Sequence, residues 1–389
     1  MNSRLIIFLL ISIFLSSSML IKSQESEQLQ SEKDTTLSAF DRFNKKAEHL
    51  FKIIPVPFVT YTQETGTSFG LAKYNLVHLS KKDTISQASK FAGVVTISTN
   101  GNMKLSGGAD INFGKGKYYM ITGIAVMKFP ELIWGIGNIV DHKNREKILI
   151  EKWELTLNGL YEMKENFYFG FNYAFSDYWN IGKEDTSFLI QQNITGANGG
   201  ILSGIGPSLI YDSRLNRYNA RQGMFFATYF TSFQKFLGSQ YIFNSLSMDF
   251  RKYFNPWLEH IIAFQVTNTY NYGNVPFFHL SMMGGSDRMR AYYLGEIRDK
   301  ILIDTQVEYR MPIWKIFGMV GFFGAGRVYP AYSDLTFKDM YFSSGLGLRI
   351  MVDSENKANL RLDFAYGENG AKAFIFGFAE AFLELLSEY

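Results

Sequence analysis

Strict alternation of apolar and polar positions dominates the chain from residue 53 onward. In "NLRLDFAY" (359–366) one parity is apolar or aromatic, while the other carries Arg361 and Asp363. The segments "MKLSGGADINF" (103–113) and "ILIDTQVEYRM" (301–311) alternate in the same way. Successive side chains of a strand point to opposite faces, so each segment predicts a strand with one apolar and one polar face. No helical stripe competes with this period after residue 53.

Sixteen segments carry strand character. They lie near 54–62, 67–79, 88–100, 102–113, 117–128, 148–163, 165–177, 200–213, 222–234, 240–254, 257–271, 299–311, 315–329, 338–353, 357–366 and 372–382. The connections 129–147, 178–199 and 272–298 are long, whereas turns such as "EMKEN", "NP" and "DSENK" are short. An even number of strands with short turns at one end and long loops at the other is typical of bacterial outer-membrane barrels.

The alternation of polar and apolar side chains along each strand is explained if the sheet crosses a membrane. A sheet can span lipid only when it closes, because every backbone polar group must be paired internally. An arginine on the lipid face would cost about 2–4 kcal/mol near the midplane, so charged residues should face the lumen. The residues placed there are Asp249, Asp304, Glu308, Arg310, Arg361 and Asp363.

The predicted fold class is therefore all-β, a transmembrane antiparallel β-barrel of about 16 strands with a short N-terminal helix or tail. A soluble β-sandwich is the rival, and the strand lengths and the export signal count against it.

The N-terminal region predicts export. Arg4 precedes the apolar run "LIIFLLISIFL" (5–15), and small and polar residues follow, so residues 1–24 are predicted to be a signal peptide, with a retained anchor helix as the alternative. Residues 25–52 form a short periplasmic segment that includes a candidate amphipathic helix at 37–51. Residues 53–389 form the barrel domain.

The composition further narrows the classes of protein and of site that the chain can represent. Aromatic residues make up 16% of the 389 residues, Cys is absent, and the net charge is +3. The small charge gives no field that would favour a nucleic-acid partner. The absence of Cys excludes disulfides and thiolate metal sites.

The sequence gives little evidence of a catalytic site. No Ser–His arrangement with an elbow motif occurs, and the histidines lack metal-like spacing; they are His49, His78, His142, His260 and His279. The chain is therefore predicted to be no enzyme, with no catalytic residues, metal or cofactor. A scattered dyad of an outer-membrane lipid hydrolase stays open.

The stretch "MMGGSDRMRAYYLGEIRDK" (282–300) is unusual for a solvated loop. Gly284 and Gly285 permit a tight turn that presents Arg288, Arg290 and Tyr292. If the loop folds into the lumen, Arg290 meets the inward carboxylates; if it stays outside, it pairs with lipopolysaccharide phosphate or water.

With these residues the chain resembles the BamA/TamA family of outer-membrane assembly and secretion barrels, the bacterial surface antigen family. That family carries a Gly-Gly pair and an Arg-Gly-Phe/Tyr tip in the loop after strand eleven. The resemblance continues in order along residues 53–382. Its further matching positions are Asp212, Arg214, Asn216 and Gly223 of a periplasmic turn, Glu308, Tyr309 and Arg310, Gly347 and Arg349, Arg361 and Asp363, and Phe382 of the closing strand.

The sequence departs from the family pattern at several positions, and these differences change the expected partners of Arg290 and the expected domain organisation. Ala291 replaces the tip glycine, and Gly324 stands where family members often carry an Asp that pairs with the tip Arg. Glu308 and Asp363 are therefore the expected lumen partners of Arg290. Seven residues follow Phe382, whereas the family usually ends near that aromatic. Residues 25–52 are too short for a periplasmic POTRA domain, so a member without POTRA domains is expected.

The resemblance implies a bacterial outer-membrane protein that assembles, inserts or translocates outer-membrane or secreted proteins. In the family, the barrel works through a seam between the first and last strands. Prolines here remove ladder donors from the first strand; the seam residues are Pro55, Pro57, Gly377 and Phe382.

Implied partners are outer-membrane lipids and lipopolysaccharide, client outer-membrane proteins and periplasmic delivery proteins. The alternative is a passive channel or a structural subunit of an outer-membrane complex without assembly activity.

Overall fold

The computed structural model describes residues 55–382, apart from short gaps at 81–82, 84–85, 87, 142, 144, 216–218 and 354–357. The predicted signal peptide and the predicted helix at 37–51 lie outside these residues. Both stay predictions.

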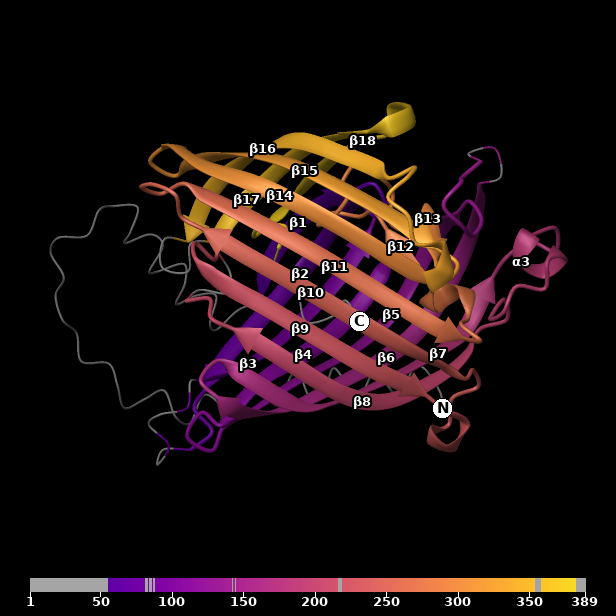
Figure 1. The fold of residues 1–389 in the computed structure, drawn as a ribbon, viewed down its shortest axis with the longest axis horizontal. Coiled ribbons are helices and arrows are strands. Elements are labelled where there is room, and N and C mark those ends of the chain that lie inside the picture. Colours follow the sequence, from indigo (N-terminus) through magenta and orange to yellow (C-terminus); the bar gives the residue numbers. More distant parts are fainter. Residues whose placement is uncertain are drawn as a thin grey trace, which may run out of the picture.

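Within the described part, sixteen antiparallel strands close into one barrel (Figure 1). The wall strands are β1 Val56–Thr62, β2 Gly66–Val77, β3 Ser89–Ser98, β4 Met103–Phe113, β5 Tyr118–Ile133, β6 Glu146–Lys164, β7 Phe167–Gly182, β8 Gly200–Asp212, β9 Gly223–Phe233, β10 Phe243–Phe254, β11 Ile261–Gly273, β14 Ile301–Trp314, β15 Phe317–Tyr329, β16 Tyr341–Asp353, β17 Ala358–Gly367 and β18 Lys372–Phe378. The predicted barrel and its strand number are confirmed.

Short elements lie in the connections at one mouth, among them the 3-10 turns η3 Lys235–Leu237, η5 Tyr332–Asp334 and η6 Glu368–Gly370, and three further features join them. They are the helical turn α3 Phe188–Gln191, the 3-10 turn η4 Phe277–His279, and a separate hairpin of β12 Ser281–Met283 with β13 Ile297–Asp299. The hairpin was not predicted from the sequence. Among the described residues, no helix is long and apolar enough to cross a membrane.

The two mouths of the barrel differ in their connections. The segments 134–145, 183–199 and 274–300 join strands at the mouth opposite to that where β1 begins and β18 ends. Long loops mark the extracellular side of outer-membrane barrels, so the mouth holding both strand ends is the periplasmic one.

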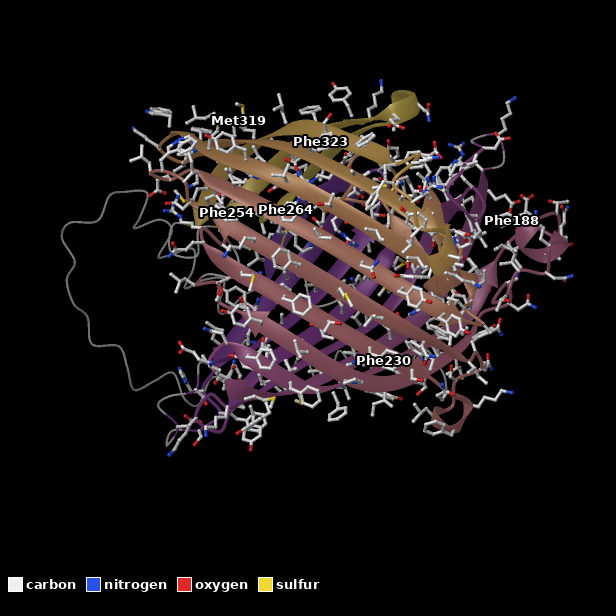
Figure 2. The ribbon with its side chains drawn as sticks, viewed as in Figure 1. Phe188, Phe230, Phe254, Phe264, Met319 and Phe323 are labelled. Atoms are coloured by element: carbon white, nitrogen blue, oxygen red, sulfur yellow. The ribbon has the colours of Figure 1, made fainter. Side chains whose placement is uncertain are left out.

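The outer surface of the wall is apolar and aromatic. Phe230, Phe264 and Phe323 project from it and are between 36% and 48% exposed (Figure 2). The opposite parity points inward: the six charged residues assigned to the lumen by parity are all buried. The period of two thus separates a hydrocarbon-facing surface from a polar interior.

Buried apolar clusters join the long loop to the inside of the wall. One apolar cluster joins Phe277 and Phe278 of the long loop to Phe233 and Phe243 of the wall. A second cluster joins Met283, Met289 and Tyr292 of the same loop to Val320 and Phe322. These clusters hold the 274–300 loop against the inside of the wall.

Candidate functional site

The loop between β11 and β14 forms the candidate site because it folds into the lumen. It enters through η4, runs along β12, turns at its tip and returns along β13. Met283 and Ile297 are opposite one another in this hairpin, and both are buried. The loop therefore contains a small two-stranded sheet of its own and extends to the polar interior of the barrel.

The tip depends on its two glycines. Gly284 and Gly285 have φ of 104° and 100°, a region that glycine adopts without strain. A Cβ on Gly284 would lie 2.6 Å from the Tyr293 carbonyl oxygen. The Gly285 amide donates to the Tyr292 carbonyl at 3.0 Å, which closes the turn. The sequence turn "GG" thus sets the direction in which the next residues project.

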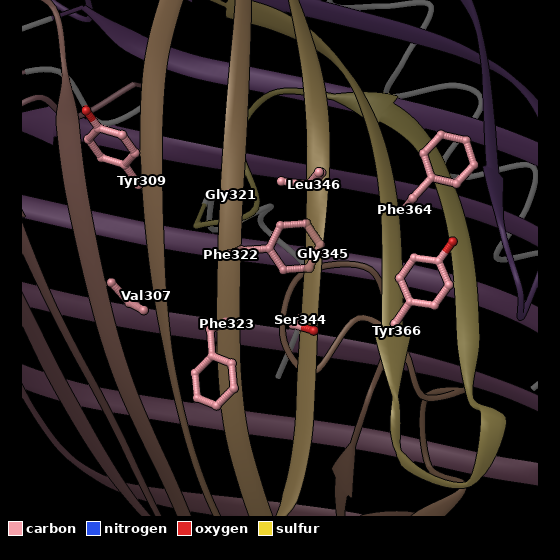
Figure 3. A pocket seen from close by; sticks show the side chains of 10 residues that line it. All are labelled: Val307, Tyr309, Gly321, Phe322, Phe323, Ser344, Gly345, Leu346, Phe364 and Tyr366. Carbon is pink, nitrogen blue, oxygen red and sulfur yellow. The ribbon is translucent and has the colours of Figure 1, made fainter.

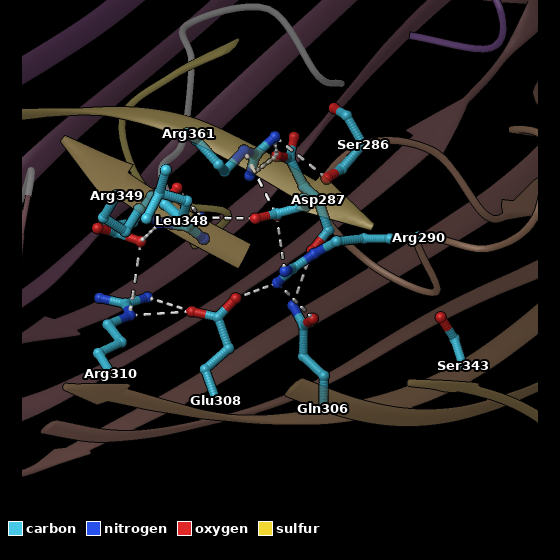
Figure 4. A network of polar contacts seen from close by, with 12 residues as sticks. Ser286, Asp287, Arg290, Gln306, Glu308, Arg310, Ser343, Leu348, Arg349 and Arg361 are labelled. Atoms are coloured by element: carbon cyan, nitrogen blue, oxygen red, sulfur yellow. Dashed lines mark hydrogen bonds and ion pairs between the residues drawn. The ribbon is translucent and has the colours of Figure 1, made fainter. Parts of the chain in front are cut away.

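Arg290 is the centre of the polar site and is 1% exposed (Figure 4). Its Nη1 donates to Oδ2 of Asp363 on β17 at 3.0 Å, and its Nη2 pairs with Glu308 on β14. The guanidinium also lies 4.0 Å from the ring centre of Phe322 on β15. One loop side chain is therefore bound to three strands of the wall.

Further arginines share the same carboxylates. Arg310 donates to Glu308 at 2.9 Å, and Arg349 donates to Asp363 at 2.5 Å. Glu380, just past β18, accepts from Arg349 at 2.9 Å. A second loop contact joins Arg361 of β17 to Asp287 at 3.2 Å. Such a shared network lets every buried carboxylate keep a cation, as a low-dielectric interior requires.

The loop also contacts both sides of the junction between the first and last strands. The Tyr292 hydroxyl donates to the Phe342 carbonyl on β16 at 2.9 Å, and it accepts from the Glu368 amide, just past β17, at 2.9 Å. On the other side, Gln63 in the β1–β2 turn donates to the Ala291 carbonyl at 3.4 Å. The neighbouring Glu64 accepts from the Leu294 amide at 2.8 Å.

The junction itself, here called the seam, is the least paired part of the wall. β1 pairs with β2 from Val56 opposite Ala72 to Thr62 opposite Gly66. β18 pairs with β17 along its whole length, ending with Phe378 opposite Leu360. Between the described residues of β1 and β18, one register pair is present, Tyr61 opposite Phe376.

Aromatic contacts supplement the seam. The rings of Tyr61 and Phe374 lie 5.8 Å apart, and those of Phe58 and Phe378 lie 6.4 Å apart. Aromatic pairs are worth about 0.5–1.5 kcal/mol each, so side chains rather than a full backbone ladder hold this junction.

A family comparison identifies this architecture. The model of the Omp85 superfamily domain matches residues 147–382, more than half of the chain. The chain belongs to the Omp85 superfamily. The resemblance noted in the sequence is confirmed at this level, and the protein is a bacterial outer-membrane barrel.

Solved structures share the fold of this Omp85 barrel. BamA from Haemophilus ducreyi lacking POTRA domains 1–3 is 14% identical, with a TM-score of 0.55, and the alignment covers 82% of this chain and 69% of that one. CdiB from Acinetobacter baumannii is 12% identical, with a TM-score of 0.51 and coverage of 84% and 59%. CdiB from Escherichia coli is 8% identical, with a TM-score of 0.53 and coverage of 83% and 62%. This chain thus spans about three fifths of the CdiB chains. No curated protein matches it.

The remaining site residues predicted from the sequence lie apart from Arg290. Arg288 pairs with Asp304 at 3.3 Å, nearer the extracellular mouth of the lumen. In the periplasmic turn, Arg214 Nε donates to Asp212 at 2.9 Å, and Gly223 has φ of 106°. Asn216 lies outside the described residues.

One seam residue must be corrected. Phe382 was expected in the closing strand, but β18 ends at Phe378 and Ala379 turns with φ of 64°. Phe382 lies instead inside the periplasmic mouth, where its carbonyl accepts from Arg251 at 2.5 Å. The chain leaves the wall because the residues after Phe378 turn toward the buried arginines. Of the other seam residues, Pro57 lies in β1 opposite Leu71 and Gly377 lies in β18 opposite Arg361, while Pro55 precedes β1.

Sequence reasoning missed three participants. Glu380, Asp287 and Arg298 were not assigned, yet all three belong to the polar contacts of the interior. Arg298 pairs with Glu131 at the end of β5 and donates to the Gly295 carbonyl at 2.8 Å. Asp287 and Arg298 lie within the stretch 282–300 that was already unusual in the sequence. Glu380 has the apolar parity of Phe376 and Phe378, where a charge indicates that the strand has ended.

The histidines make no metal site within the described residues. His260 lies 2.8 Å from the Tyr309 hydroxyl. His279 lies in η4 and packs against the stacked rings of Phe233 and Phe243, and burial, together with the charge of Lys152, lowers its pKa to about 4. His279 is therefore neutral at physiological pH and packs as an aromatic ring.

Proposed function

We propose that this Omp85 barrel assists the assembly, insertion or translocation of outer-membrane or secreted proteins through its seam. The proposed role is not enzymatic. The single observation that carries the proposal is the short pairing between β1 and β18. A strand edge with free backbone donors and acceptors is a template for another strand, so an opened seam can pair with a client.

The infolded loop is proposed to brace the wall beside this seam. Arg290 ties the loop to β14, β15 and β17, whereas Ala291 and Leu294 contact the turn that follows β1. A rigid loop anchored in this way keeps the C-terminal wall in place while the β1 edge separates. The lumen partners Glu308 and Asp363 act here as positioning groups.

Locking the seam tests the proposal. Tyr61 and Phe376 are opposite one another, and the chain contains no Cys, so a Tyr61→Cys/Phe376→Cys pair can be oxidised without competing thiols. We expect cells that depend on the oxidised variant to lose folded client proteins from the outer membrane. A reductant should restore the clients.

A matched lock elsewhere provides the control. Leu71 and Val95 are opposite one another in β2 and β3, where the ladder is continuous, and both side chains are exposed. Leu71→Cys/Val95→Cys should oxidise without affecting clients. Full client assembly with the seam locked would contradict the proposed role.

The passive-channel alternative makes a different prediction. The proposed role requires a lumen obstructed by the loop and its ion pairs, so planar bilayers should show small or unstable conductance. A wide, stable pore would favour a channel, and locking the seam would then leave that conductance unchanged.

A further inference from the structure

The outer surface of the wall contains a hollow of about 730 Å³ over β14–β17 (Figure 3). Its floor is formed by Gly321 and Ser344, which have little or no side chain. Around them stand larger outward side chains, including Phe323, Leu346 and Phe364.

The hollow faces hydrocarbon rather than water. Gly321 and Ser344 have the parity of Phe323 and Leu346, which are 48% and 60% exposed on the lipid side. An apolar depression in this position gains contacts only when another apolar group fills it. The apolar group available in a membrane is a lipid acyl chain.

Basic residues stand at the extracellular end of the hollow. Arg327 has the same parity as Phe323 and lies four residues further along β15, about 13 Å at the rise of a strand. Its Nη1 donates to the Lys338 carbonyl and lies 3.5 Å from the carboxylate of the exposed Asp339, while its Nε has no hydrogen-bond partner among the described residues. Lys372 is exposed and lies opposite Tyr366, which lines the hollow. The two cations stand on β15 and β18, three strand spacings or about 14 Å apart, so they flank the hollow rather than meet at one point.

We propose that this hollow binds an acyl chain of a phosphate-bearing glycolipid of the outer leaflet, of the lipid A class. The chain lies over Gly321 and Ser344, and the two phosphates of the headgroup lie near Arg327 on one side and Lys372 on the other. The wall behind the site is thin, because Gly345 has no side chain and the ring of Phe322 covers it from within. That ring is the one that stacks on Arg290, so the lipid and the infolded loop lie on opposite sides of one stretch of wall.

Filling the hollow tests the acyl-chain contact. A Cβ on Gly321 would approach nothing closer than Leu346 Cδ2 at 3.8 Å, so Gly321→Leu fits the fold and occupies the hollow. The control is Gly107→Leu, since Gly107 shares the outward parity of Met103 on β4, and its nearest neighbour would lie at 3.6 Å. Native mass spectrometry of the detergent-purified full chain with added lipid A measures retention. We expect at least a tenfold loss for Gly321→Leu and none for Gly107→Leu.

A second comparison needs no substitution in the hollow. The wild-type protein should retain lipid A better than dephosphorylated lipid A or phosphatidylethanolamine, and Arg327→Gln/Lys372→Gln should remove that preference. Equal retention by Gly321→Leu and Gly107→Leu would overturn the proposal. Equal retention of the phosphorylated and dephosphorylated lipids by the wild type would also overturn it, as would photocrosslinking from Gly321 to a polypeptide instead of lipid.

Discussion

Removing the Arg290 side chain should loosen the tip of the infolded loop. Arg290→Ala deletes the hydrogen bond to Asp363, the ion pair with Glu308 and the contact with the ring of Phe322. Removing one member of a buried ion pair usually destabilises by about 3–5 kcal/mol, because the partner charge stays buried. Here both carboxylates keep another guanidinium, from Arg310 and Arg349. The lower end, about 3 kcal/mol, is therefore expected.

Hydrogen exchange measures this loosening where it should occur. A loss of about 3 kcal/mol corresponds to roughly a hundredfold faster exchange, since each 1.4 kcal/mol is a factor of ten. Amides of residues 284–296 should show that increase, while those of β2–β4 should not change. Arg221→Ala is the matched control, because Arg221 forms an exposed ion pair with Glu259, a class worth at most about 1 kcal/mol. Loop exchange within threefold of wild type in Arg290→Ala would refute the assignment of Arg290 as the anchor.

Three further changes have defined outcomes. Gly284→Ala should abolish the tip turn, because its φ is positive and a Cβ would approach the Tyr293 carbonyl, and loop proteolysis should detect the change. The pKa of His279 is about 4 in the folded protein against an ordinary 6.5, so the unfolded chain binds a proton more readily. The free energy of unfolding should therefore fall as the pH drops from 6.5 toward 4. The thermal midpoint of a His279→Gln variant should vary less over that pH window. Glu380→Gln should weaken the contact with Arg349 by about 1–3 kcal/mol and lower the temperature at which the barrel unfolds on heat-modifiability gels, and an unchanged temperature would contradict a structural role for Glu380.

The strands could be predicted because lipid imposes the period of two on each of them. Parity alone placed Glu308 and Asp363 inside, and the structure gives both as buried. The predicted segments near 200–213 and 315–329 agree closely with β8 and β15. Boundaries were less accurate at the end of β5, which continues to Ile133, past the predicted end at 128.

The interior could be predicted only in part, because its contacts join distant segments. Arg290 was found through the pattern of the loop, but the hairpin of β12 and β13 has three residues in each strand, too few to show a period. Glu380 lay within the predicted segment 372–382, which continued past the real end of β18. The turn at Ala379 depends on buried arginines of other strands, and no local pattern reports their positions.

The sparse pairing of β1 with β18 also bears on how the protein reaches its folded state. Tyr61 and Phe376 come from opposite ends of the polypeptide, so closing the ring joins the residues of greatest sequence separation and gains a single backbone pairing. Non-local closure of this kind is slow, because chain entropy is lost before contacts compensate for it. During biogenesis, the growing sheet should therefore persist as an open ribbon with two bare edges, and this protein would need the same shelter from aggregation that its proposed clients need.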